Sequence, residues 1–360
     1  MRKATQAFLL VVFCTACLMA QNTFVYTNND GSPNSISAFS AAASGVLSPV
    51  PGSPFLTGGN GAGGGFFAPP RITTAVVKDF LFAANSGSNN VSVFSINPAT
   101  GVLTAVPGSP FATGGVATGV GMSLTATPDD KFLVAANGAS MTITVFSIAA
   151  SGALSQVAGS PFPSGAGGPL ASAKVTSDGK FLAVSWAPGN ISMFSISATG
   201  GLTPVPGSPL PDTGAAGIDC NCASTQLNVA INGTASAEVD VFNIGPSGAL
   251  SRIPGSPFTG PGANSNVAIL SPDDSKLFVS DQGSNTVTVF SVAANGSLTV
   301  VSGSPFPAPG TIAPSGMATN QAGTLLYAAA FNNLISGFSI GASGALTSVP
   351  GSPWVRLFCD

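Results

Sequence analysis

A tetrapeptide that recurs along the whole chain constrains the fold more than any other feature of the sequence. It consists of Gly-Ser-Pro followed by a bulky apolar residue, and consecutive copies begin 48 to 56 residues apart. Self-similarity at such a spacing indicates a repeat architecture, in which each copy marks one structural unit. The seven copies begin at Gly52, Gly108, Gly159, Gly207, Gly255, Gly303 and Gly351.

A second motif keeps step with the first and predicts β-structure. It reads Ser-Val-Phe-Ser-Ile at residues 92–96, and every other unit has a similar run. Such runs alternate with a period of two and are rich in β-branched and aromatic residues, which is typical of strands. Their phenylalanines should fill equivalent buried places between units, each contributing roughly 1.5–3 kcal/mol by transfer from water. These residues are Phe39, Phe94, Phe146, Phe194, Phe242, Phe290 and Phe338.

One unit shows the expected order of strands. Four runs with strand character follow one another, and Asp178-Gly179 supplies a tight turn between the first two. They cover residues 171–176, 181–186, 191–197 and 201–205. A small sheet of this kind cannot bury both of its faces alone, whereas a closed ring of sheets can. The sequence therefore predicts an all-β, seven-bladed β-propeller of four-stranded antiparallel blades.

The closure of this ring leaves two interpretations open. Residues 24–28 align with the second strand of the other units, so the first blade has no innermost strand of its own. Residues 355–359 could supply that strand from the C-terminal end. However, only six residues follow Trp354, fewer than the other units use to reach the next inner strand. Otherwise the first blade is three-stranded.

The N-terminal segment has the character of an export signal. Arg2 and Lys3 precede an apolar run that ends in small residues at Ala20, which is typical of a signal peptide over residues 1–20. The propeller domain would then span residues 21–360. A second interpretation is lipidation at Cys17, because Thr15-Ala16-Cys17 resembles part of a lipobox. No internal apolar run reaches the length of a membrane span, so we expect an extracytoplasmic, periplasmic or secreted protein.

The charge composition excludes several classes of function. Charged residues make up 6% of the chain, and after loss of residues 1–20 the acidic residues outnumber the basic ones. Nucleic-acid binding requires a basic patch, so that class is excluded. The chain has no histidine and no paired His-Cys cluster, so neither a metal ion nor another cofactor is predicted. The repeat carries no information on oligomeric state.

Several segments together resemble a known group of proteins. They are Phe-Val-Tyr-Thr-Asn at 24–28 and the longer runs at 81–94, 131–137 and 276–290. The chain resembles the seven-bladed lactonase-like propellers, whose relatives are named for a Tyr-Val-Thr-Asn repeat. The resemblance implies a fold shared with sugar-lactone hydrolases of the 6-phosphogluconolactonase type and with muconate-lactonising enzymes. It also implies chemistry at the channel mouth by His, Glu and Arg. This chain departs from that pattern, because it has no His and only one Glu, Glu238.

Three ionisable residues are expected near the channel and are the candidate site. Arg71 precedes the inner strand of the second blade, Lys174 lies in that of the fourth, and Asp219 in that of the fifth. Lactone hydrolysis needs a base to activate water and a donor or cation to stabilise the oxyanion. Asp219 would be the base, and Arg71 or Lys174 the electrophilic partner. In a purely structural role, Lys174 would extend to solvent and Asp219 would bond to backbone groups.

Two functions therefore compete. The first is an exported binding or surface-interaction module, whose partner at the channel mouth is a small molecule, a glycan or a protein. The alternative is a hydrolase of an uncharged sugar-type lactone, since a phosphorylated one would demand several basic groups together. Asp219 close to Arg71 or Lys174 would favour the hydrolase. A channel mouth lined by Ser, Thr, Asn and Gly alone would favour the binding module.

Overall fold

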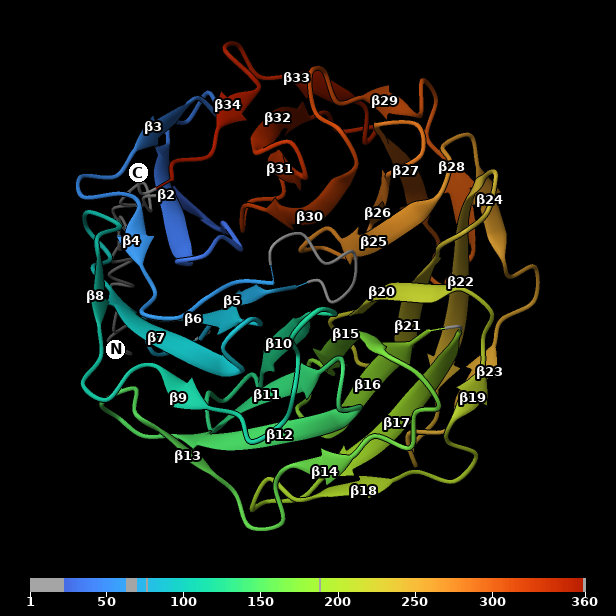
Figure 1. Cartoon of the computed structure of the whole chain (residues 1–360). Helices are drawn as coiled ribbons and strands as arrows, with labels where there is room; N and C mark the ends of the chain where they lie inside the picture. Colours follow the sequence, from blue (N-terminus) through green and yellow to red (C-terminus); the bar gives the residue numbers. More distant parts are fainter. Residues whose placement is uncertain (1–22, 63–69, 76, 188, 359–360) are drawn as a thin grey trace, which may run out of the picture.

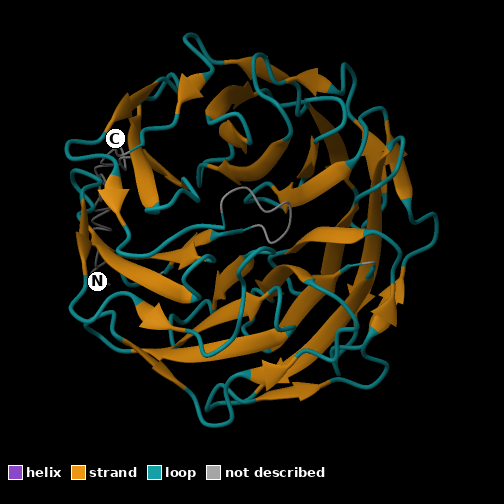
Figure 2. Cartoon of the chain, viewed as in Figure 1, coloured by secondary structure: helices purple, strands orange, loops and turns teal. Residues whose placement is uncertain are grey.

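Seven antiparallel sheets radiate like blades from a central axis in the computed structural model (Figures 1 and 2). The structure describes residues 23–62, 70–75, 77–187 and 189–358. The all-β, seven-bladed propeller predicted from the sequence is confirmed. The proposed signal at residues 1–20, with Cys17, lies outside the described residues.

The strands fall into five classes by their place in the blade. The innermost are β5 (Ile72–Thr74), β10 (Met122–Ala126), β15 (Leu170–Val175), β20 (Ala215–Cys220), β25 (Ser265–Leu270) and β30 (Pro314–Thr319). The second strands are β1 (Thr23–Asn28), β6 (Phe80–Asn85), β11 (Phe132–Asn137), β16 (Phe181–Trp186), β21 (Gln226–Ile231), β26 (Lys276–Asp281) and β31 (Leu325–Ala330). The third strands are β2 (Ser35–Ala41), β7 (Asn90–Ile96), β12 (Thr142–Ile148), β17 (Asn190–Ile196), β22 (Ala237–Ile244), β27 (Thr286–Val292) and β32 (Leu334–Ile340).

Two shorter classes form the outer edge. The fourth strands are β3 (Leu47–Pro49), β8 (Leu103–Ala105), β13 (Leu154–Gln156), β18 (Leu202–Pro204), β23 (Leu250–Arg252), β28 (Leu298–Val300) and β33 (Leu346–Ser348). The fifth are β4 (Phe55–Leu56), β9 (Phe111–Ala112), β14 (Phe162–Pro163), β19 (Leu210–Pro211), β24 (Phe258–Gly260), β29 (Phe306–Pro307) and β34 (Trp354–Val355).

The fourth and fifth strands of a blade act as one interrupted outer strand. In the third blade, β13 pairs with Phe146–Ile148 at the end of β12, whereas β14 pairs with Thr142 and Ile143 at its beginning. The Gly-Ser-Pro motif lies between the two segments. The predicted four-stranded blade is therefore correct in outline, and its outermost strand is divided in two by the motif.

The motif serine explains why the motif recurs. Its hydroxyl oxygen accepts a hydrogen bond from a backbone N–H of the third strand, at the gap between the two outer segments. The bond has the same form in every blade, from Ala38 N to Ser53 Oγ, Val93 to Ser109, Val145 to Ser160, Met193 to Ser208, Val241 to Ser256, Val289 to Ser304 and Gly337 to Ser352, at 2.8–2.9 Å. The serine thus replaces the missing ladder partner of a buried amide.

The aligned phenylalanines fill the interfaces between neighbouring blades, as predicted. All seven are no more than 2% exposed. Phe94 of the second blade packs with Ile36 of the first, and Phe146 of the third packs with Phe82 of the second. Each sheet therefore buries its faces against the sheets beside it, and the ring stabilises itself cooperatively.

In the described part of the chain, the first blade has no inner strand. Within the described chain, β1 is hydrogen-bonded to β2, and its other edge carries no strand. Val355 pairs with Leu334 of the seventh blade, and residues 356–358 form no strand, so the alternative in which residues 355–359 supply the inner strand is not realised in the described part. The first blade instead contacts the C-terminal segment 356–358 through Ser37, whose hydroxyl donates a hydrogen bond to the Leu357 carbonyl oxygen at 2.8 Å.

The serine bond can be tested by its removal. We expect Ser109→Ala to lower the free energy of unfolding by about 1–3 kcal/mol, because it leaves the buried Val93 N–H without its partner. The measurement is urea-induced unfolding followed by circular dichroism. Ser95→Ala in the same blade is the control, since Ser95 makes only an exposed bond to the Thr104 carbonyl oxygen and should change stability little. Equal effects of the two substitutions would contradict this role of the motif.

A buried carboxyl at the end of β26 makes stability depend on pH. Asp281 is fully buried and occupies the position held by Asn85 and Asn137 in other blades. Burial raises its pKa to about 6, although its carboxylate accepts hydrogen bonds from Thr288, Thr286 and Ser265. A carboxyl with a raised native pKa binds more protons in the native state than in the unfolded chain. Its contribution to stability therefore falls as the pH rises from about 4 to about 6.

We expect Asp281→Asn to remove the loss of stability that ionisation of Asp281 causes at rising pH. The stability of the variant relative to the wild type should grow by about 2–3 kcal/mol between pH 4 and pH 7, as the wild-type carboxyl ionises. Urea unfolding of both proteins at several pH values measures the difference. A difference that does not change with pH would show that folding leaves the Asp281 pKa unchanged.

Candidate functional site

A cavity of about 740 Å³ lies along the propeller axis and is the candidate site. Its walls come from the inner strands of several blades and from β1, whose residues Thr23–Asn28 all line it. The cavity includes the place beside β1 that an inner strand would occupy in the other blades. The open edge of β1 therefore forms one of the cavity walls.

Three charged side chains from distant parts of the sequence gather at one end of the cavity. Asp30 comes from the loop between β1 and β2, Arg71 directly precedes β5, and Arg356 follows β34. Asp30 Oδ2 accepts a hydrogen bond from Arg71 Nη1 in an ion pair. We call these three residues the mouth cluster. With two arginines and one aspartate, it is positive.

Arg356 is held in place by the backbone of the two blades that it joins. Its guanidinium donates to the carbonyl oxygens of Asn28 and Ala330, both at 3.1 Å, and to Asn333 Oδ1 at 2.7 Å. Its Nε is buried and has no hydrogen-bond partner among the described residues. Burial lowers the pKa of Arg356 to about 10, so the side chain is still protonated at neutral pH.

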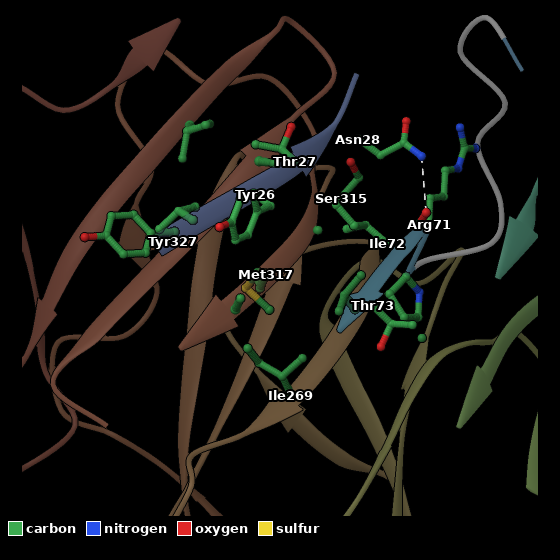
Figure 3. Close-up of a pocket in the computed structure, with 18 of the residues that line it drawn as sticks. Tyr26, Thr27, Asn28, Arg71, Ile72, Thr73, Ile269, Ser315, Met317 and Tyr327 are labelled. Atoms are coloured by element: carbon green, nitrogen blue, oxygen red, sulfur yellow. Dashed lines mark hydrogen bonds between the residues drawn. The ribbon is translucent and has the colours of Figure 1, made fainter. Parts of the chain in front are cut away.

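Asn28 fixes the position of Arg71 from the neighbouring first blade. Its side-chain amide donates to the carbonyl oxygens of Arg71 at 3.2 Å and Ala84 at 2.8 Å, which ties β1 to the second blade across the missing strand. Figure 3 shows this contact, with Asn28 and Arg71 at one end of the cavity and Ile269 toward the other. The backbone of Arg71 is therefore fixed by a hydrogen bond, which limits where its side chain can lie.

The second charged group is an ion pair near the other end. Lys174 Nζ lies 2.7 Å from Asp219 Oδ1, and Asp219 also accepts hydrogen bonds from the backbone N–H groups of Cys220 and Leu270 at 3.0 and 2.9 Å. The Asp219 side chain is 13% exposed and that of Lys174 is 38% exposed. The Asp219 carboxylate raises the pKa of Lys174 well above its usual range, so Lys174 is a cation and not a base at neutral pH.

The structure brings together two of the three residues predicted from the sequence. Lys174 and Asp219 are each the fifth residue of their inner strand, whereas Arg71 lies just before the start of β5. Inner strands of successive blades run in the same direction, so Arg71 lies toward the opposite end of the cavity from the ion pair. The pairing of Asp219 with Lys174 is observed, and the pairing with Arg71 is not. The structural interpretation of Asp219 is also observed, since it bonds to two backbone N–H groups.

The remaining walls are mostly apolar. Ile72, Ile269 and Met317 face the cavity, and the tyrosines Tyr26 and Tyr327 lie between the blades (Figure 3). The Tyr26 hydroxyl donates to the Gly101 carbonyl oxygen at 2.9 Å, and the Tyr327 hydroxyl donates to that of Gly45 at 2.7 Å. Burial raises the pKa of both tyrosines, that of Tyr327 to about 12. Neither is therefore an acid at neutral pH.

Sequence reasoning missed Asp30 and Arg356. Both flank the incomplete blade, one after β1 and the other in the C-terminal tail. The signal that could have found them is the lack of an inner strand next to residues 24–28 in the sequence, because charged residues on either side of such a gap lie close to it.

Two further observations concern metal ions and the membrane. Among the residues that the structure describes, no three His, Cys, Asp or Glu side chains group in a way that could hold a metal ion. Within the same residues, no helix is long and apolar enough to cross a membrane.

Comparison with known families agrees with the resemblance seen in the sequence. Residues 233–353 match the family described as "Lactonase, 7-bladed beta-propeller". These residues run from the fifth blade to the seventh, and the motifs they contain are those of the blade scaffold. No curated protein sequence matches the chain.

Solved structures with the same fold cover almost the whole chain. A putative 6-phosphogluconolactonase from Bacteroides fragilis is 21% identical, with a TM-score of 0.75, and the match covers 95% of this chain and 97% of that one. A periplasmic gluconolactonase from Pseudomonas aeruginosa is 19% identical, with a TM-score of 0.72 and coverage of 92% and 97%. At these identities the likeness establishes the shared propeller fold.

The ion pair at the far end of the cavity predicts a change in the reactivity of Lys174. We expect Asp219→Asn to lower the Lys174 pKa, because the attraction that holds its proton is lost. Acylation of Lys174 by acetic anhydride at pH 8.5, measured by mass spectrometry of tryptic peptides, should become about tenfold faster or more. Lys131, which pairs with Asp129 on the surface, serves as the internal control and should react equally in both proteins. An unchanged rate at Lys174 would contradict the coupling.

Proposed function

We propose that this protein is an exported binding module that takes a ligand with an acidic group into its axial cavity. The observation that carries the proposal is the mouth cluster, in which Arg71 and Arg356 converge on one end of a 740 Å³ cavity in an otherwise acidic chain. A guanidinium recognises a carboxylate through charge and paired hydrogen bonds. Mostly apolar walls with a few convergent polar groups are typical of small-molecule sites.

The bonding of the two carboxylates favours binding over catalysis. A general base must take a proton from water that lies within hydrogen-bond reach. Asp219 already accepts bonds from Lys174, Cys220 and Leu270, and Asp30 is paired with Arg71. Both carboxylates therefore serve first to hold cations and backbone in position.

The proposed export rests on the N-terminal sequence. Residues 1–20 have the charge and apolar pattern of a signal peptide, with lipidation at Cys17 as the alternative route. The likeness to a periplasmic gluconolactonase is compatible with an extracytoplasmic location.

Hydrolysis of an uncharged sugar-type lactone is the second candidate. The observation in its favour is the contact between Lys174 and Asp219, which puts a carboxylate and a cation side by side at the cavity, as a lactone hydrolase requires. The names of the similar solved structures point in the same direction. In this scheme Asp219 would accept a proton from water, and Lys174 would stabilise the oxyanion.

Binding can be tested with two ligands of matched size. We expect gluconate to bind and sorbitol, which replaces the carboxylate with an alcohol, to bind at least about tenfold more weakly, since the mouth cluster attracts a negative charge. Isothermal titration calorimetry measures both. Arg356→Gln should weaken gluconate binding by about tenfold or more.

The control variant is Lys131→Gln, which removes one positive charge from the surface at a residue that does not line the cavity. It should leave gluconate binding unchanged. Equal affinity for gluconate and sorbitol, or equal effects of the two substitutions, would contradict recognition by the mouth cluster.

The second candidate has its own test. If the protein is a lactone hydrolase, glucono-δ-lactone should open faster than its spontaneous rate, and Asp219→Asn should abolish the excess. A pH indicator follows the acid that is released. If ring-opening stays at the spontaneous rate while gluconate binds, the hydrolase is excluded and the binding module is supported.

A further inference from the structure

Among the second strands, β1 alone has an inner edge that pairs with no strand of the described chain. Six blades carry an innermost strand, and in each of them the second strand is covered on both edges. Within the described residues, β1 pairs with β2 alone. Its burial differs accordingly, because five of its six residues are only partly buried, whereas all six of the equivalent strand β6 are buried.

The alternation of the β1–β2 ladder shows which backbone groups face the gap. Asn29 N–H donates to the Ser35 carbonyl oxygen, so Thr27 and Val25 also turn their backbone groups toward β2. Phe24, Tyr26 and Asn28 then direct theirs to the open edge. Arg356 confirms this direction, since it donates to the Asn28 carbonyl oxygen from that side.

The second blade shows what these groups bind when an inner strand is present. Ala84, which has the same ladder position as Asn28, donates its N–H to the carbonyl oxygen of Arg71 at the start of the inner segment. The amides of the open edge of β1 thus have the geometry for a further antiparallel strand, and the cavity beside them provides the space.

We propose that an extended peptide segment of a partner protein adds to this edge and becomes the inner strand of the first blade. This inference rests on the proposed binding function and names the ligand as polypeptide. The segment would run antiparallel to β1 over five or six residues, the length of the inner strands β10 and β15. Strand addition of this kind obtains affinity from main-chain hydrogen bonds and selectivity from side-chain pockets.

The surroundings define the chemistry of the segment. The walls beside the gap include Ile72, Met317 and Tyr327, so its alternating side chains must be small or apolar. Inner strands enter the channel from the mouth cluster, because Arg71 directly precedes β5. The first residue of the segment therefore lies by Arg71 and Arg356, and charge complementarity requires it to be acidic.

A synthetic peptide tests the proposal directly. The probe is acetyl-Asp-Ser-Asn-Val-Ala-Ile-Leu-amide, which is the sequence of β25 preceded by an aspartate. We expect it to slow amide hydrogen exchange, measured by NMR on the purified protein, by about tenfold or more at Phe24, Tyr26 and Asn28. Val25 and Thr27, which already bond to β2, should keep their exchange rates.

Two control peptides separate strand addition from unspecific binding. A peptide with lysine in place of the aspartate should bind at least about tenfold more weakly, because it meets two arginines. A peptide that is N-methylated at every second residue on the edge facing β1 should give no protection, because it cannot donate to that strand. Equal binding of all three peptides would overturn the proposal.

A gluconate titration of the same samples distinguishes the two levels of inference. Gluconate binding without peptide protection would overturn the strand addition and leave the proposed binding function standing. Failure of both ligands would overturn both. Protection of Phe24, Tyr26 and Asn28 before any peptide is added would also overturn the strand addition, because the chain itself would then fill the gap.

Discussion

The face that each blade shares with its neighbours is the contact on which the rest of this structure depends. One phenylalanine per unit fills that face, and none of the seven is more than 2% exposed. A blade alone would leave these rings in water, so the sheets are stable only as a ring. The ring in turn sets the positions of the inner strands, and these determine the axial cavity. The motif serines also stabilise each blade, because their hydroxyl oxygens accept hydrogen bonds from third-strand N–H groups that the divided outer strand leaves without a backbone partner.

The candidate site depends on the first blade, whose second strand β1 lines the cavity directly. Six of the seven blades have an innermost strand within the described residues, and the open edge of β1 in the first blade lines the cavity. Two hydrogen bonds connect the blades around this space. Asn28 donates to the Arg71 carbonyl oxygen of the second blade, and Arg356 donates to the Ala330 carbonyl oxygen of the seventh. These contacts bring Asp30, Arg71 and Arg356 together, although their numbers in the sequence lie far apart. An inner strand beside β1 would occupy the space between these side chains.

The electrostatics of the cavity explain why we favour recognition over catalysis. Each carboxylate that lines it is paired with a cation, so the charges hold one another in fixed positions. Such preorganised cations suit a ligand that brings its own negative charge. Elsewhere the buried Asp281 shows the opposite situation, since burial raises its pKa toward neutrality where other blades carry a neutral asparagine.

The sequence by itself determined the architecture of this protein, because the period of the Gly-Ser-Pro motif and the alternation of the Phe-containing strands are local patterns. It also placed Lys174 and Asp219 on inner strands, since both lie at the same position of their repeats. The division of the outer strand required the structure, because Phe162–Pro163 is too short to predict as a strand and is recognised only by its pairing with β12. The sequence also placed Arg71 before the inner strand of the second blade, but its grouping with Asp30 and Arg356 depended on tertiary structure. Asp30, Arg71 and Arg356 share no motif, and only the closure of the ring between the seventh, first and second blades brings their charges to one place.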